Sequence, residues 1–224
     1  LGGSTIILNT DNIHYGIGDE SIKDTAKILS EYTDVVMIRT SKHKKLEEFA
    51  KHSNIPVING LSEQGHPCQI MSDILTFEEI KGNIKGKTIA WIGDGNNNMS
   101  HSFIEASAKF GFKFKIGCPD KYKPSKNILV WAKKNKASIT VTKNPGDAVK
   151  DADCIMTDKW VSMNDKEDKK KKKKMLKPYQ VNKKIMRLAK SDAIFMHCLP
   201  VSRGEEATDE VIDGKQSVVW TQAL

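Results

Sequence analysis

Short apolar runs alternate with amphipathic stretches along the whole chain. The apolar runs are rich in valine, isoleucine and threonine and end at polar or glycine positions, which is typical of β-strands. We expect strands at residues 5–8, 35–38, 88–92, 113–116, 138–142, 154–157, 193–197 and 217–220. We expect helices at residues 21–31, 44–52, 71–81, 101–110, 127–136, 146–150 and 183–189. This alternation predicts an α/β fold with doubly wound parallel sheets and helices on both faces of each sheet.

A turn-rich segment at residues 82–87 divides this pattern. We expect a domain boundary there, with residues 1–82 forming the later, truncated part of one α/β domain and residues 83–224 forming most of a second. Ligands of open α/β sheets bind beyond the carboxyl ends of the strands. Polar residues of chemical interest follow several of the predicted strands, so we expect an enzyme.

Composition narrows the class of protein. The chain has 224 residues, of which 38% are hydrophobic and 29% charged, as in a soluble globular protein. We find no apolar run that would span a membrane and no signal peptide, and the four scattered cysteines favour a reducing, cytoplasmic setting. The chain begins with leucine, so we expect its natural start to lie upstream.

The net charge of +8 owes much to six consecutive lysines at residues 169–174. We interpret this run as a solvated helix face rather than a nucleic-acid patch, because no aromatic residues are interleaved with the lysines.

Two motifs suit an anionic ligand. His66-Pro67-Cys68-Gln69 opens a predicted helix, where backbone amides attract anions and the two polar side chains are donors for a phosphate or a carbonyl oxygen. The alternative is a proline-started helix with a polar cap. Arg39 ends a predicted strand, and its guanidinium can bind phosphate through two hydrogen bonds, unless it is simply a surface arginine.

Three further motifs follow predicted strands. The turn from Gly93 to Asn97 lacks the third glycine of a dinucleotide loop, because Asn98 stands there. Its amides suit the zwitterionic end of an amino acid, or are ordinary turn chemistry. Asp158 can pair with a ligand amine or cap a helix. Cys198, before Leu199 and Pro200, is either a site residue or a buried small hydrophobe.

The motifs become specific in combination. Six motifs follow one another along the chain: the initial Leu-Gly-Gly, Asp24-Thr25-Ala26, His66-Pro67-Cys68-Gln69, the segment 91–97, Asp158-x-Trp160-x-Ser162-Met163 and His197-Cys198-Leu199-Pro200. In these motifs the chain resembles the ornithine carbamoyltransferase family over essentially its whole length. Ser162-Met163 favours the ornithine enzyme over the aspartate enzyme.

The resemblance implies a role for each matching residue. Residues 1–82 would belong to the carbamoyl-phosphate-binding domain and residues 83–224 to the ornithine-binding domain. Carbamoyl phosphate would be bound by Arg39, His66 and Gln69. Ornithine would be bound by Asn97, Asp158, Ser162 and Met163, the last two through a mobile loop, with Cys198 and Leu199 between the ligands. Catalytic roles would fall to Arg39, His66, Asp158 and Cys198.

The family uses no metal or organic cofactor and forms homotrimers that share active sites, so the resemblance implies the same here. It implies no nucleic-acid or membrane partner. The family's Ser-x-Arg-Thr-Arg phosphate motif would precede Leu1, and its closing helix would follow Leu224. We therefore expect residues 1–224 alone to be nearly inactive. The alternatives are a carbamoyltransferase for putrescine or an acylated ornithine, and a non-catalytic binding or assembly module.

Overall fold

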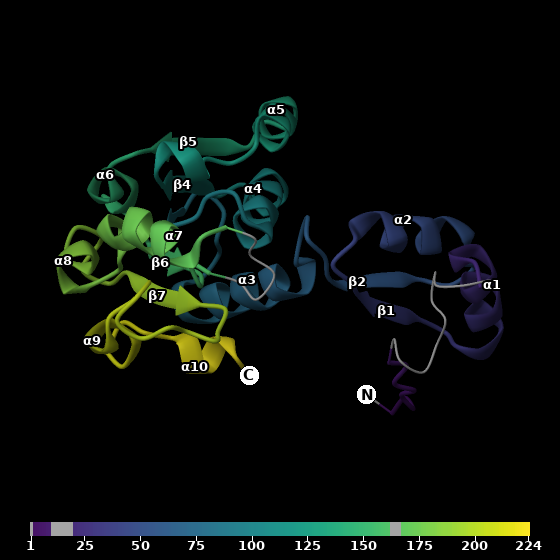
Figure 1. Cartoon of the computed structure of the whole chain (residues 1–224). Coiled ribbons are helices and arrows are strands. Elements are labelled where there is room, and N and C mark those ends of the chain that lie inside the picture. Colours follow the sequence, from purple (N-terminus) through teal and green to yellow (C-terminus); the bar gives the residue numbers. More distant parts are fainter. Residues whose placement is uncertain (1, 10–19, 162–166) are drawn as a thin grey trace. The chain divides into compact units, whose positions relative to one another are not determined.

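The computed structural model describes residues 2–9, 20–161 and 167–224, and the chain divides into two compact units, Leu1–Glu63 and Gln64–Leu224 (Figure 1). The first unit contains α1 (Ile22–Tyr32), β1 (Val36–Arg39), α2 (His43–His52) and β2 (Val57–Leu61). β1 and β2 pair in parallel. The unit is therefore of the predicted α/β class.

One face of this two-stranded sheet is covered by the two helices. Ile22 and Ala26 of α1 and Phe49 of α2 form a small buried cluster against alternate strand residues such as Val36. On the other face Met37 is 67% exposed. The two described helices of this unit, which was expected to be truncated, therefore cover one face of its sheet.

Two local predictions in the first unit are corrected. Residues 5–8 form no strand, although their composition is that of one. β2 was not predicted, because Asn59 and Gly60 resemble turn residues. Gly60 nevertheless lies in the strand beside Met37, where an added Cβ would come within 3.1 Å of the methionine side chain.

The second unit is built on a five-stranded parallel sheet in the order β5-β4-β3-β6-β7, which runs from top to bottom in Figure 1. Its strands are β3 (Thr88–Ile92), β4 (Lys113–Gly117), β5 (Ser138–Thr142), β6 (Cys154–Thr157) and β7 (Ile194–His197). Its α-helices are α3 (Pro67–Lys81), α4 (Asn98–Phe110), α5 (Lys126–Lys134), α6 (Pro145–Val149), α7 (Lys169–Leu176), α8 (Lys183–Met186), α9 (Asp209–Ile212) and α10 (Val219–Gln222). Two short 3₁₀ helices lie at Asp120–Tyr122 and Lys177–Tyr179.

Successive residues of the central strands enter opposite cores. In β3, Trp91 packs into the core that contains residues of α3 and α4, whereas Ile92 packs into the core that contains residues of α6, α8 and α9. All four residues of β6 and of β7 are buried. The doubly wound architecture is thus confirmed in this unit.

The end of the second unit differs from its prediction. Residues 217–220 were expected to form a strand, but Ser217 makes only an isolated bridge to Phe195 and the chain then enters α10. Valines and a tryptophan favour a strand by composition. The chain forms a short helix here instead. In this helix Val219 packs into the core, and Gln222 forms hydrogen bonds with α3 and with the end of β7.

The compact units part at residues 63 and 64, ahead of the boundary we expect at residues 82 and 83. The physical reason is α3, whose Ile70, Ile74 and Phe77 are buried in the core that also contains Trp91 and Phe103. The expected domain boundary itself stays a prediction.

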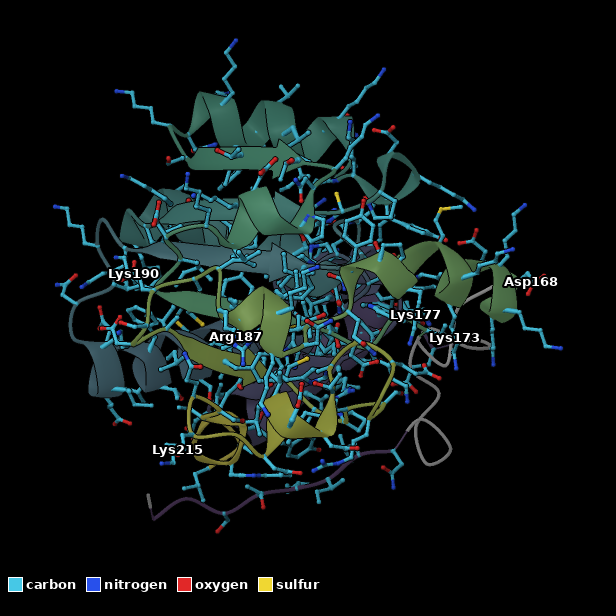
Figure 2. All side chains as sticks on the ribbon, turned by 90° about the vertical axis from the view of Figure 1, so that its left-hand side faces the viewer. Asp168, Lys173, Lys177, Arg187, Lys190 and Lys215 are labelled. Carbon is cyan, nitrogen blue, oxygen red and sulfur yellow. The ribbon has the colours of Figure 1, made fainter. Side chains whose placement is uncertain are left out.

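The lysine run is only partly a solvated face. It forms α7, and Figure 2 labels Asp168 and Lys173 on this segment. Lys172 is buried, and its Nζ lies 2.8 Å from Oδ2 of Asp94, with side chains 11% and 9% exposed. The prediction is therefore wrong for Lys172, because this side chain binds the turn that follows β3.

We expect Lys172→Met to lower the free energy of unfolding by about 3 kcal/mol, because Asp94 would remain buried without this partner. Lys171→Met is the matched control, since Lys171 is exposed on the same helix. Urea denaturation of both variants measures the difference. Equal stabilities would show that the buried ion pair contributes nothing.

Candidate active site

The candidate site lies where the strand order of the second unit reverses. The chain passes from β3 outward through β4 and β5, then returns to β6 on the other side of β3. Parallel sheets bind ligands beyond the carboxyl ends of strands at such a switch point. Asn97 follows β3, Asp158 follows β6 and Cys198 follows β7, so three of the predicted residues lie at this edge.

The backbone of the turn after β3 explains its glycines. Gly93 has a φ of +127°, which glycine adopts far more easily than other residues. A Cβ on Gly95 would lie 2.9 Å from the carbonyl oxygen of Tyr122. The turn then leads to Asn97, the N-cap of α4, whose side chain accepts the backbone N–H of Ser100 at 2.8 Å.

Asp158 is the centre of the hydrogen bonding at this edge. Its Oδ1 accepts the backbone N–H of Lys159 at 2.6 Å and the thiol of Cys198 at 3.2 Å. Its Oδ2 accepts from Nδ2 of Asn97 at 3.3 Å. All three donors are neutral, so they orient the carboxylate without neutralising its charge.

Burial sets the protonation of this pair of groups. Burial raises the pKa of Asp158, while His197 and the Cys198 thiol act in the opposite direction. Burial, together with the neighbouring Asp158, raises the pKa of the Cys198 thiol well above its usual value. Cys198 therefore stays a thiol at neutral pH and donates its hydrogen to Asp158, which is the available acceptor.

The turn after β7 is held by His197. The backbone N–H of Leu199 donates to Nδ1 of His197 at 2.9 Å, and Nε2 of His197 lies 3.4 Å from Oε1 of Glu206. Both the His197 and the Glu206 side chains are fully buried. Because Nδ1 accepts a hydrogen bond, the proton of the ring belongs on Nε2, facing Glu206. This arrangement places Cys198 and Leu199 at the edge of the sheet, with Leu199 at a φ of +53°.

The predicted anion motif begins α3. His66 is the N-cap residue, Pro67 begins the helix, and the backbone N–H of His66 donates to Oγ of Ser102 at 2.9 Å. Gln69 lies in the first turn and donates from Nε2 to Oδ1 of Asp73 at 2.9 Å. The proline-started helix is confirmed. Binding of an anion at its N-terminus stays a prediction.

A cavity of about 310 Å³ lies between α3, the end of β7 and residues 222–224. It is lined by Gln69, Ser72, His197, Cys198, Gln222, Ala223 and Leu224. Gln69 from α3 and Cys198 from the end of β7 thus face one space, although they are far apart in the sequence.

The structure does not bring every predicted residue to this place. Arg39 is exposed at the end of β1 in the first unit, and its part in the site stays a prediction. Ser162 and Met163 lie outside the described residues. The remaining predicted residues belong to the second unit. Of these, Gln69 and Cys198 line the cavity, whereas His66, Asn97, Asp158 and Leu199 are not among its lining residues.

Sequence reasoning missed Asp73 and Gln222. Gln222 donates from Nε2 to Oδ1 of Asp73 at 2.6 Å and accepts the backbone N–H of His197 at 2.8 Å. Gln69 and Asp73 are four residues apart, a spacing that brings side chains together on a helix, and α3 contains both because it begins at Pro67 rather than at residue 71. Nothing in the sequence pattern indicated the contact of Asp73 with Gln222, because it joins residues 149 positions apart.

No group of three histidine, cysteine, aspartate or glutamate side chains in residues 2–9, 20–161 and 167–224 is placed to hold a metal ion. None of the helices in these ranges has the length and apolar character needed to cross a membrane.

Comparison with known proteins identifies the family. Residues 1–79 match the carbamoyl-P binding domain, and residues 85–224 the Asp/Orn binding domain, of aspartate/ornithine carbamoyltransferase. The chain is 52% identical to an ornithine carbamoyltransferase of Rhodopseudomonas palustris and 51% identical to one of Agrobacterium fabrum. It aligns over its whole length with 71% of the first relative and 72% of the second.

Solved structures agree with the sequence relatives. Ornithine carbamoyltransferase from Pyrococcus furiosus superposes with a TM-score of 0.92 at 43% identity, over 99% of this chain and 72% of that one. The enzyme from Thermus thermophilus gives a TM-score of 0.87 at 32% identity, over the same shares of the two chains. Together with the geometry at the switch point, these matches show that the chain belongs to the aspartate/ornithine carbamoyltransferase family.

Proposed function

We propose that this protein transfers the carbamoyl group of carbamoyl phosphate to the side-chain amine of ornithine, which gives citrulline and phosphate. The observation that carries the proposal is Asp158, a carboxylate held by three neutral donors at the carboxyl end of β6. No lysine or arginine of the described ranges forms an ion pair with it. A cationic amine is the natural partner of such a group.

The reaction needs a neutral amine, because only the lone pair of the nitrogen can attack the carbonyl carbon. An alkyl ammonium has a pKa of about 10, so a proton must leave before or during attack. We assign binding of the ammonium and acceptance of that proton to Asp158. The Cys198 thiol orients Asp158 as a donor, and the thiol itself is not the base because its pKa is raised.

As the new C–N bond forms, negative charge develops on the carbonyl oxygen, and the C–O bond to phosphate then breaks. A fixed donor to such an oxyanion contributes about 3 kcal/mol to catalysis. We assign this task to His66 and Arg39, with phosphate at the N-terminal end of α3. Holding the two substrates in register supplies much of the remaining acceleration.

An acceptor panel tests the proposal. The natural protein that carries this sequence is assayed for carbamoylation of ornithine, putrescine and N-acetylornithine with carbamoyl phosphate. We expect ornithine to give the highest kcat/KM, because similarity to the named relatives runs through both matched domains. A preference for another amine would replace ornithine as the acceptor, and no turnover with any amine would favour a binding or assembly module.

Three finer expectations accompany this proposal. We propose a homotrimer, which light scattering on the purified protein tests through its molar mass. We propose a cytoplasmic location, which cell fractionation tests. Low activity of residues 1–224 alone stays a prediction, and citrulline formation by that polypeptide measures it.

A further inference from the structure

A chain of hydrogen bonds connects α3 with the end of β7 beside the cavity. Oδ1 of Asp73 accepts from Nε2 of Gln69 at 2.9 Å and from Nε2 of Gln222 at 2.6 Å. Oε1 of Gln222 in turn accepts the backbone N–H of His197 at 2.8 Å. One buried carboxyl group therefore connects a cavity-lining glutamine with the backbone that precedes Cys198.

The carboxyl group determines which way the Gln69 amide points. An ionised carboxylate only accepts hydrogen bonds, so the Gln69 amide must present its N–H to Asp73. The reversed amide would place its carbonyl oxygen against Oδ1, with no proton between the two atoms. Within the described residues no hydrogen bond reaches Oε1 of Gln69, whose side chain lines the cavity. The amide oxygen is thus left as an acceptor for a ligand.

Packing alone would not select an aspartate at this position. Asp73 is 2% exposed and lies among the buried apolar residues Ile70, Ile74 and Phe77 of α3. Burial raises its pKa to about 6, although the two glutamine side chains oppose the shift. Its second oxygen, Oδ2, has no hydrogen-bond partner among the described residues. A buried carboxyl group with one oxygen unpaired lowers stability, which indicates that Asp73 has another task.

We propose that Asp73 is a positioning residue for the carbamoyl donor. It holds the carbonyl oxygen of Gln69 toward the cavity, where that oxygen accepts an N–H of the carbamoyl group. Through Gln222 it also fixes the backbone at His197, and so the place of Cys198. The proposal rests on the proposed function, because carbamoyl phosphate is the ligand that supplies this N–H.

Steady-state kinetics of the natural protein test the proposal. Asp73→Leu removes the acceptor, and we expect it to raise KM for carbamoyl phosphate about tenfold, as for the loss of one hydrogen bond. Asp73→Asn keeps an acceptor oxygen, so its KM should stay close to that of the unaltered protein. Thr76→Val is the matched control, since it removes a buried hydrogen bond of α3 that is not directed at Gln69.

A double-mutant cycle separates positioning from general damage. If Asp73 acts through Gln69, Asp73→Leu should raise KM no further in a Gln69→Leu background. Additive increases would overturn the proposal, as would an equal increase in the Thr76→Val control.

NMR of the unaltered protein tests the positioning role without measuring turnover. It therefore still applies if the variants fold poorly or if the proposed function is wrong. The side-chain amide protons of Gln69 in the unaltered protein should exchange slowly with solvent, and their NMR signals should shift as the pH passes about 6, where Asp73 ionises. Fast exchange without a shift would overturn the positioning role alone. Absence of citrulline together with slow, pH-sensitive amide signals would overturn the proposed function instead.

Discussion

Asp158→Asn is expected to lower kcat/KM for carbamoyl transfer at least about 100-fold, the effect of losing a general base. Asparagine keeps the shape of the side chain and an oxygen for the thiol of Cys198. It removes the charge that binds the ammonium and the basic oxygen that takes its proton. The effect should be present in kcat as well as in KM, because proton removal belongs to the transition state.

A second aspartate, at the other end of β6, provides the control. Asp153 precedes β6 and Asp158 follows it, so the two carboxyl groups stand at opposite ends of one strand. Asp153 is buried and accepts the backbone N–H of Thr88 at 2.8 Å and Nζ of Lys190 at 2.6 Å. Asp153→Asn should therefore lower stability while kcat/KM stays near that of the unaltered protein. Comparable kinetic losses in both variants would remove Asp158 from the chemistry.

The second unit could be predicted well from the sequence because most of its strands are continuous apolar or β-branched runs, and β3, β6 and β7 are buried on both faces. β3, β5 and β6 begin and end where the apolar runs do. β2 and α10 could not be predicted, for opposite reasons. In β2, Asn59 and Gly60 have low intrinsic strand propensity, and pairing with β1 overrides it. In α10, residues with strand propensity are placed by tertiary contacts of Val219 and Gln222.

The same distinction applies to the candidate site. Residues that directly follow a strand, such as Asp158 and Cys198, could be proposed because the carboxyl ends of parallel strands meet at one edge. Asp73 and Gln222 act on the site through Gln69 and the backbone of His197, and no motif in the sequence marks either residue. Their role appears only when α3 and α10 are placed against the end of β7. Sequence patterns thus indicate groups at strand ends and miss the groups that orient them.

The buried carboxyl group of Asp73 should also make stability depend on pH in an unusual direction. Its pKa is about 6 in the folded protein against a usual value of 3.8, because burial disfavours the charged form. Between these values the folded state binds more protons than the unfolded state, so this group lowers stability as the pH rises. Asp158 raises the pKa further and His197 lowers it. The full cost above the folded pKa is roughly 3 kcal/mol.

Asp73→Asn removes the titration, so its unfolding free energy relative to the unaltered protein should rise by roughly 2 kcal/mol between about pH 4 and about pH 7. The pH-dependent difference, rather than the absolute stability, is the measured quantity, because the new amide nitrogen replaces an oxygen without a partner in the described residues. Urea denaturation at several pH values measures it. Thr76→Val, which does not titrate, should differ from the unaltered protein by a constant amount. A constant difference for Asp73→Asn as well would mean that Asp73 ionises near its usual pKa and that its burial does not disfavour the charged form.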